Sequence, residues 1–271
     1  LKMVLDDAEL EELIPVDPCR KVRPPRVEPT PVRILAPGQP KRMIAAVGSM
    51  PESRRGPVDM DDSVEVWALL FELAFTSGMR AGERYALMPY ELELRDGVPG
   101  IFVQQQIQEY GRPGDAVIPK WLDAEHLYGI LWLTTPKTRA ATRFVPIPQG
   151  LWDRLWARIR RLHVGPRELV FTNQLGHPVR EATERHHWLK ALEAAGLPQV
   201  RIHSARHWMA SMTARAGMPE DARVSIMGHV SLQMTMHYTH RDAASLGRLM
   251  AAAIPDLHDG IEIIDATPAR G

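Results

Sequence analysis

The segment IMGHVSLQMTMHYTH, residues 226–240, contains three histidines and Tyr238 but no acidic residue. It has three interpretations: a metal site, an ordinary helix, or the surroundings of a reactive tyrosine. A tyrosine hydroxyl, whose pKa is ordinarily about 10, is a weak nucleophile unless cations lower that pKa or a base takes the proton. Chemistry at Tyr238 would therefore require cationic and basic side chains from other parts of the chain.

A second histidine-rich segment, HSARH, gives only weak support for a metal site. His203 and His207 have the spacing of a helical zinc pair, but Ser-Ala stands where a metalloprotease has its glutamate. The single cysteine, Cys19, cannot form an internal disulfide or a cysteine-based zinc cluster. The sequence also has no GK[ST] phosphate loop and no Gly-x-Ser-x-Gly motif. We expect neither a metal nor another cofactor.

Three segments taken together are more specific: TSGMRAGERYAL, IHSARHW and MGHVSLQMTMHYTH. In this order they resemble the signature regions of the tyrosine recombinase family, also called phage-type integrases, and the similarity covers about residues 35–255. A fourth segment, TTPKTRAATRFVPIP, resembles the β-hairpin turn in which that family carries a catalytic lysine. The resemblance implies one supporting carboxylate, Glu83, and six catalytic residues: Arg80, Lys137, His203, Arg206, His229 and Tyr238.

The resemblance implies a site-specific recombinase that cuts and rejoins DNA without metal or ATP. Tyr238 would attack the phosphate and form a 3′-phosphotyrosine, and this ester keeps the bond energy for rejoining. Two guanidinium groups, Arg80 and Arg206, would hold the non-bridging oxygens, while Lys137 would protonate the leaving 5′ oxygen. His203 would serve as the base and His229 as a further donor to the phosphate. The family also implies a homotetramer on paired double-stranded DNA sites, in a bacterium or a phage.

Each of these residues has a simpler interpretation when it is taken alone. Arg80 could be a surface charge or an ion-pair partner of Glu83, three residues later. Lys137 could be a solvated turn residue, and Tyr238 a half-buried aromatic. Two other functions also remain open: DNA relaxation by a type IB topoisomerase-like enzyme, and DNA binding by a non-catalytic accessory relative.

The net charge of zero argues against a nucleic-acid partner, but the charges are unevenly distributed. Residues 1–100 hold 13 Lys/Arg against 17 Asp/Glu, whereas residues 137–215 hold 14 against 5. Such a segment could form a phosphate-facing surface or a solvated basic face. Within it, we hypothesise that Arg139 and Arg143 contact DNA phosphates.

The expected fold class is α+β and mostly helical, with one small antiparallel sheet, as in the tyrosine recombinase catalytic fold. Apolar periodicity and glycine stops predict helices over residues 62–78, 80–88, 150–163, 180–196, 203–217 and 244–254. Short β-branched runs predict strands within residues 91–97, 100–108, 129–135 and 141–148, interrupted by an irregular insertion over 110–127.

Three parts of the chain are expected. Residues 1–34 would be the end of a truncated upstream helical core-binding domain with a Pro/Arg-rich linker, residues 35–255 the catalytic domain, and 256–271 a C-terminal tail. The tail contains a strand-like GIEII, and we expect it to dock on a neighbouring protomer. Neither a signal peptide nor an apolar run of 18 residues is visible, so a cytoplasmic location is expected.

Overall fold

The computed structural model describes residues 2–22, 32–50, 64–119, 121–136, 142–173, 175–228 and 242–261. The chain divides into two units, Leu1–Val32 and Arg33–Gly271. The first unit contains helix α1, Lys2–Leu10, followed by turns in which Glu9 accepts a hydrogen bond from the Asp17 amide at 3.0 Å and pairs with Arg20 at 3.3 Å. The remaining elements belong to the second unit.

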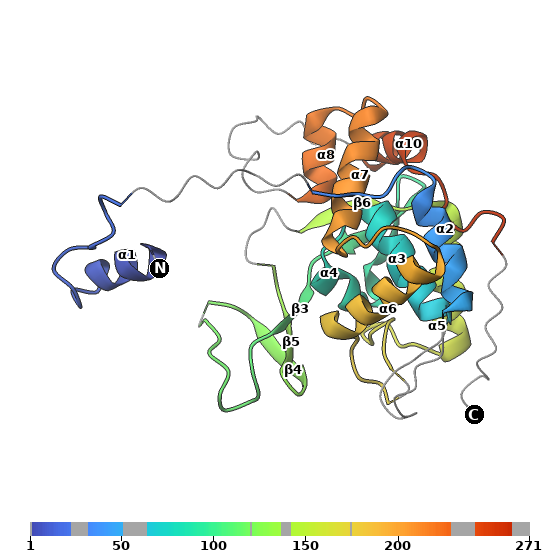
Figure 1. Cartoon of the computed structure of the whole chain (residues 1–271). Coiled ribbons are helices and arrows are strands. Elements are labelled where there is room, and N and C mark those ends of the chain that lie inside the picture. Colours follow the sequence, from blue (N-terminus) through green and yellow to red (C-terminus); the bar gives the residue numbers. More distant parts are fainter. Residues whose placement is uncertain are drawn as a thin grey trace. The chain divides into compact units, whose positions relative to one another are not determined.

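The second unit is built around α3, Val64–Ser77, in which every residue from Val66 onward is buried. A helix that is apolar on all sides has to be covered on all sides. Five helices of the described part pack against it: α2 (Gln39–Ala45), α4 (Ala81–Tyr85), α5 (Gln149–Leu162), α6 (Glu181–Ala194) and α7 (His203–Arg215). A short 3-10 helix, η1 (Ala46–Ser49), completes this cover. The core of the unit is therefore helical, with α3 at its centre (Figure 1).

Aromatic side chains join α3 to α6 and α7. The Trp188 ring meets Phe71 edge-on at 5.2 Å and stacks on Phe75 at 5.3 Å, and Trp208 meets Phe75 edge-on at 5.5 Å. Such pairs contribute about 0.5–1.5 kcal/mol each beyond the area that they bury. They fix α7, which carries two predicted site residues, against the central helix.

In the part of the chain that the structure describes, two three-stranded antiparallel sheets replace the single sheet that the sequence predicted. One sheet has the order β1-β2-β6, with strands Leu92–Arg95, Val98–Val103 and Arg143–Pro146, and the 3-10 helix η2 (Pro89–Glu91) precedes β1. The other has the order β3-β5-β4, with strands Gln106–Glu109, Leu131–Thr134 and Ala124–Tyr128. Strand β4 lies inside the insertion predicted to be irregular, so that prediction was wrong for residues 124–127.

The β3-β5-β4 sheet extends away from the helices, with α4 (Ala81–Tyr85) at its β3 side (Figure 1). A Cβ atom on Gly82 of α4 would collide with the carbonyl oxygen of Ile107 in β3. Only glycine allows these two backbones to approach so closely. This contact fixes where the sheet meets the helical body.

The predicted helices are present, with shifted ends. The structure places α10 at Ala243–Ala253, and it ends α4 three residues earlier than predicted. A further helix, α8 (Glu220–Met227), begins after Pro219 and ends at Gly228, which has a left-handed φ of 65°. Residues 226 and 227 of the opening segment therefore belong to a helix, whereas residues 229–241 lie outside the described part of the chain.

The chain after α10 returns to the helical body. Leu257 and His258 are buried, and His258 Nδ1 contacts Glu72 in α3. Packed residues thus continue beyond the predicted domain end at 255, and residues 262–264 of the predicted strand lie outside the described part. Among the described helices, none is both long and apolar enough to span a bilayer.

Candidate functional site

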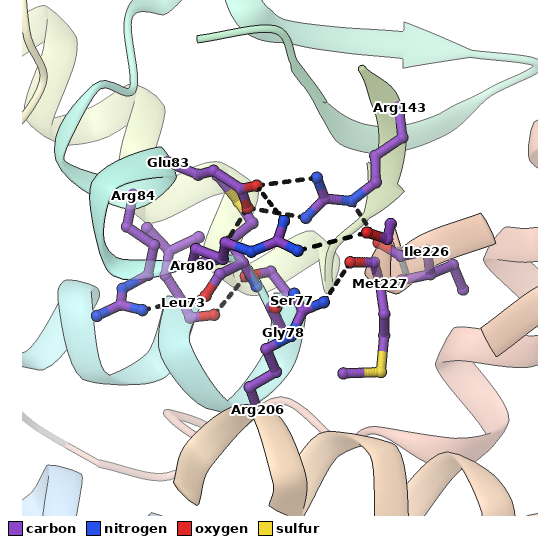
Figure 2. Close-up of polar contacts among 12 residues, drawn as sticks. Leu73, Ser77, Gly78, Arg80, Glu83, Arg84, Arg143, Arg206, Ile226 and Met227 are labelled. Carbon is purple, nitrogen blue, oxygen red and sulfur yellow. Dashed lines mark hydrogen bonds and ion pairs between the residues drawn. The ribbon is translucent and has the colours of Figure 1, made fainter. Parts of the chain in front are cut away.

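Three arginines from separate parts of the chain meet at the C-terminal end of α8 (Figure 2). Arg80 immediately precedes α4, Arg143 is the first residue of β6, and Arg206 lies in the first turn of α7. The fold therefore brings together side chains that are distant from one another in the sequence.

Glu83 lies between two of these arginines. Its carboxylate accepts from both terminal nitrogens of Arg143, at 3.1 and 2.8 Å, and from Arg80 Nη1 at 3.0 Å. It also accepts from the Arg80 amide at 2.8 Å, which satisfies a free N–H at the start of α4. Burial raises the pKa of Glu83, but the charges and hydrogen bonds of Arg143 and Arg80 outweigh burial and hold that pKa below its usual value. The carboxylate is therefore ionised at neutral pH.

Three successive carbonyl oxygens at the end of α8 each accept from a different arginine. Ile226 O accepts from Arg143 Nε at 2.6 Å, Met227 O from Arg206 Nη2, and Gly228 O from Arg80 Nη2 at 3.5 Å. The last carbonyls of a helix have no partner within the helix and carry its negative partial charge, so cations are favoured there.

Gly228 is required at this position for two reasons. Its φ of 65° is disfavoured for residues with a Cβ, and a Cβ here would lie 3.1 Å from Arg143 Cδ. The glycine of the Gly-His pair thus allows α8 to end against Arg143.

Arg206 is a buried cation that lines a cleft beside the site. Its terminal nitrogens donate to Gly78 O and Met227 O. Burial, followed by the charges of Arg80 and Arg143, lowers its pKa to about 10. Arg206 remains charged at neutral pH, and among the described residues no carboxylate pairs with it.

A cleft of about 610 Å³ opens beside these arginines. It is lined by α4, strand β3 and the first residues of α6 and α7, and its walls include Arg80, His203 and Arg206. Burial, together with the charges of His207, Arg206 and Arg80, lowers the pKa of His203. Its ring is therefore neutral at neutral pH, which is the form that can accept a proton.

A second buried ionic group supports the floor of the cleft. Arg84 Nη2 donates to both carboxylate oxygens of Glu184, at 2.6 and 2.7 Å, and the Tyr85 hydroxyl donates to the same carboxylate. Burial and the Glu184 charge raise the pKa of Tyr85 well above its usual value, so this tyrosine stays protonated. The group ties α4 to α6.

Four of the chain's five tyrosines are described, and each has a contact of its own. Besides Tyr85, Tyr110 donates to Gln108 at 2.7 Å, Tyr90 donates to Gln105 at 3.2 Å, and Tyr128 stacks on His177 at 3.7 Å. Of these, Tyr85 and Tyr110 line the cleft. The fifth tyrosine is Tyr238.

Four of the predicted site residues lie together: Arg80, Glu83, His203 and Arg206. Four others lie outside the described residues: Lys137, Arg139, His229 and Tyr238. The β-hairpin turn predicted around Lys137 falls on residues outside the described part; of the strands on either side, β5 pairs with β3 and β4, and β6 pairs with β2. The segment that contains Lys137 joins two different sheets.

Arg143 does not occupy the surface position that a phosphate contact would need. Its side chain is only 4% exposed and donates to Glu83 and to Ile226 O. This burial argues against a direct contact between Arg143 and DNA phosphates. Neither its link to Glu83 nor the Arg84–Glu184 pair was predicted, because both join residues that are distant in the sequence. Among the described residues, no group of three His, Cys, Asp or Glu could hold a metal ion.

Known proteins resemble this chain in both sequence and fold. Residues 58–245 match the phage integrase family. A tyrosine recombinase XerC-like protein of Caldanaerobacter subterraneus subsp. tengcongensis is 28% identical over 184 residues, which cover 63% of this chain and 44% of that protein. A tyrosine recombinase XerC of Mesorhizobium japonicum is 33% identical over 119 residues, 42% of this chain and 38% of that protein. The chain spans less than half the length of the curated relatives that it matches.

Solved structures show the same fold. The integrase of transposon Tn1549, in complex with a circular intermediate DNA, superposes with a TM-score of 0.59 at 18% identity, over 90% of this chain and 74% of that one. The XerH site-specific recombinase bound to palindromic difH substrate superposes with a TM-score of 0.51 at 18% identity, over 85% of this chain and 56% of that one. The helices around α3 and the small antiparallel sheets thus form the tyrosine recombinase catalytic fold. Because the family match covers well over half of its residues, this chain belongs to the phage integrase family.

Proposed function

We propose that this protein is a site-specific DNA recombinase that cleaves and rejoins strands through a 3′-phosphotyrosine at Tyr238. The observation that carries the proposal is the excess of positive charge at the cleft. Arg80 and Arg143 share the single carboxylate Glu83, and Arg206 donates to main-chain oxygens. A cleft with more guanidinium groups than carboxylates favours an anion, and a phosphodiester that gains charge in its transition state fits this need.

The predicted site residues would serve separate steps of the reaction. Arg80 and Arg206 would hold the non-bridging phosphate oxygens, each through a planar group that stays charged. His203, which is neutral at neutral pH, would take the proton of the Tyr238 hydroxyl as that oxygen bonds to phosphorus. The bond from phosphorus to the 5′ oxygen breaks, and Lys137 would give this oxygen a proton, while His229 would donate to the phosphate.

The product keeps the phosphodiester energy in the tyrosine ester. A 5′-hydroxyl from another strand can attack this ester and release Tyr238, so the sum of the two steps needs neither ATP nor metal. Exchange between strands requires two sites held together. We therefore propose that the protein works as a homotetramer on paired double-stranded sites, and that its C-terminal tail contributes to contacts between protomers.

Covalent trapping from a mixture of DNA sequences tests this proposal and identifies the target site at the same time. The protein is incubated with a pool of randomised duplexes that each carry one nick, so that cleavage beside the nick releases a short fragment and prevents rejoining. We expect a denaturant-stable protein–DNA adduct with the wild type and none with Tyr238→Phe. Sequencing the captured DNA gives the substrate for all later assays.

The matched control is Tyr128→Phe, which changes an aromatic outside the cleft and should leave the adduct intact. If Tyr110→Phe lost the adduct and Tyr238→Phe kept it, the nucleophile would be Tyr110 and the proposal would be wrong. If no DNA formed an adduct, the result would favour the alternative of a non-catalytic DNA-binding protein. Relaxation of a supercoiled plasmid without joining of two captured sites would indicate the type IB topoisomerase-like alternative.

A further inference from the structure

We propose that Arg143 is a positioning residue for this reaction, one that holds Arg80 and the end of α8 in a fixed relation without touching DNA. The proposal rests on the proposed function, because the position of Arg80 matters only if Arg80 holds the scissile phosphate. It replaces the phosphate contact that the sequence suggested for Arg143.

The first step of the argument is the geometry of the Arg143 side chain. Its two terminal nitrogens face Glu83, at 3.1 and 2.8 Å, while Nε faces Ile226 O at 2.6 Å. A guanidinium group is planar and rigid, so these contacts fix the carboxylate relative to the α8 end. A lysine could make only part of this arrangement, because its ammonium is a single point of charge.

The second step is that Glu83 passes this position on to Arg80. The carboxylate that Arg143 holds also accepts from the amide of Arg80 and from its Nη1. The Arg80 side chain is 42% exposed and lines the cleft, whereas Glu83 is 3% exposed. The exposed Arg80 side chain is thus held by the buried Glu83 carboxylate, and Arg143 holds that carboxylate in turn.

The third step concerns what lies next to Arg143 and Ile226 in the chain. Arg143 starts β6, shortly after the segment that carries Lys137, and Ile226 stands three residues before His229. One side chain therefore connects the strand after the predicted acid, the support of the first arginine, and the helix before the predicted phosphate donor. A residue that only stabilised the fold would not need to connect these three parts of the site.

Arg158 offers a matched control elsewhere in the same unit. Its Nε donates to a main-chain oxygen, Val170 O, at 3.1 Å, and its Nη1 pairs with Glu65 at 2.6 Å. Its side chain is 1% exposed and does not line the cleft. Replacing Arg158 removes a buried arginine with the same kinds of contact, so it reports the general effect of such a loss on the fold.

The test compares Arg143→Lys and Arg143→Met with Arg158→Met on the captured DNA sequence. Adduct formation is measured in a single turnover, per folded molecule, and DNA affinity is measured separately. We expect both Arg143 variants to slow adduct formation by about 10- to 100-fold while DNA affinity changes by less than about threefold. Arg158→Met should leave the rate per folded molecule within about twofold of the wild type. An Arg143→Lys protein that cleaves at the wild-type rate overturns the proposal.

A double-mutant cycle separates positioning from an independent contribution. If Arg143 acts through Arg80, the Arg80→Lys protein should lose little more when Arg143→Met is added, because the two residues form one unit. If the two substitutions instead reduced the rate of adduct formation by independent factors that multiply, the proposal would be wrong.

Amide hydrogen exchange gives a readout that does not depend on activity. We expect faster exchange in residues 220–228 of Arg143→Met, and no change there in Arg158→Met, because the first variant alone removes a donor from the α8 end. Unchanged exchange would overturn the proposal even if the wild type formed no adduct. Absence of the wild-type adduct, in turn, refutes the proposed function and not the link between Arg143 and α8.

Discussion

Two groups of arginines in the larger unit pair with carboxylates, and they differ in charge balance. On the outer side of α3, three guanidiniums of α5 meet three carboxylates: Arg154, Arg158 and Arg161 contact Glu65, Glu72 and Asp256. Beside the cleft, Arg80 and Arg143 share one carboxylate, Glu83, while Arg206 donates only to main-chain oxygens among the described contacts. The balanced group holds elements together, whereas the unbalanced group leaves positive charge for a ligand.

This difference also shows why counting basic residues was ambiguous. The segment 137–215 has a large excess of arginine, yet three of the four arginines of α5 are engaged with acids from earlier and later parts of the chain. Only the contacts reveal which guanidiniums are neutralised. The group of Arg80, Arg143 and Arg206 differs from the α5 group in having fewer carboxylate partners, not in having more arginines.

The largest expected effect follows from removing a cation on the unbalanced side. Arg206→Lys should slow strand cleavage by about 10²- to 10³-fold, because an ammonium cannot replace the fork that stabilises the phosphate in the transition state. Arg161→Lys, on the balanced side, should leave the rate nearly unchanged. Single-turnover adduct formation measures both, and equal rates in the two variants would remove the functional distinction between the groups.

The next effect is on stability and compares the two kinds of carboxylate. Glu83→Gln should lower the free energy of unfolding by about 3 kcal/mol, because it leaves two guanidiniums without their shared anion. Glu65→Gln should lower it by about 1 kcal/mol, since Glu65 is 23% exposed and water screens its charge. Urea denaturation, with the slope checked for constancy, measures both. A larger loss in Glu65→Gln would reverse the comparison.

The Glu83 contribution should depend on pH in one direction. Its pKa in the folded protein lies below the unfolded value of 4.5, so its stabilising effect is present above that value and is lost as pH falls through the folded pKa. The gap in stability between the wild type and Glu83→Gln should therefore narrow in acid. A gap that widens on acidification would contradict the assignment of an ionised carboxylate.

A buried carboxylate without an arginine sharpens the comparison further. Glu91 accepts from the Met88 amide at 3.0 Å and from Gln105 at 3.2 Å, and burial raises its pKa to about 8. Between pH 4.5 and about 8 the folded protein therefore keeps Glu91 protonated, whereas the unfolded chain ionises it. Folding becomes less favourable as pH rises through this range. Glu91→Gln should stabilise the protein at pH 8 by on the order of 1–3 kcal/mol, and this gain should vanish below pH 4.5. Thermal unfolding across pH measures the difference.

The smallest effect is expected where the chain after α10 joins the balanced group. Asp256 accepts from Arg154 and from the His258 amide, each at 2.9 Å. Asp256→Asn keeps an acceptor oxygen but removes the charge, so the free energy of unfolding should fall by about 0.5–1 kcal/mol. Chemical denaturation measures it, and a loss as large as that of Glu83→Gln would show that the two groups are energetically alike.

Much of this arrangement could be predicted from local patterns. The helices follow from apolar periodicity and glycine stops, and the predicted site residues Arg80, Glu83, His203 and Arg206 do lie together. The Arg80–Glu83 ion pair, which would be the simple interpretation of these residues, also exists. It turned out to be part of the site and not an alternative to it.

The rest depended on long-range pairing that no local pattern specifies. Strand β4 pairs with β5, whereas β5 and β6 belong to different sheets. Similar turn residues separate these strands in the sequence, so the turns do not indicate which strands pair. Likewise, the sequence alone suggests that Arg143, at the start of a strand, is a surface charge. It is buried because the fold brings its partners Glu83 and Ile226 beside it. Tertiary contacts decide such cases, because they determine burial.

The close approach at Gly82 has a practical consequence for modifying the protein. The β3-β5-β4 sheet meets the helical body at its β3 edge, whereas β4 is the strand farthest from that edge in the strand order. The connection over residues 110–123 joins β3 to β4, and Val117 within it is highly exposed. Lengthening such a loop changes stability only slightly. A fluorescent tag or a labelled peptide inserted at Val117, which does not line the cleft, would therefore report on the sheet while leaving the lining residue Tyr110 in place.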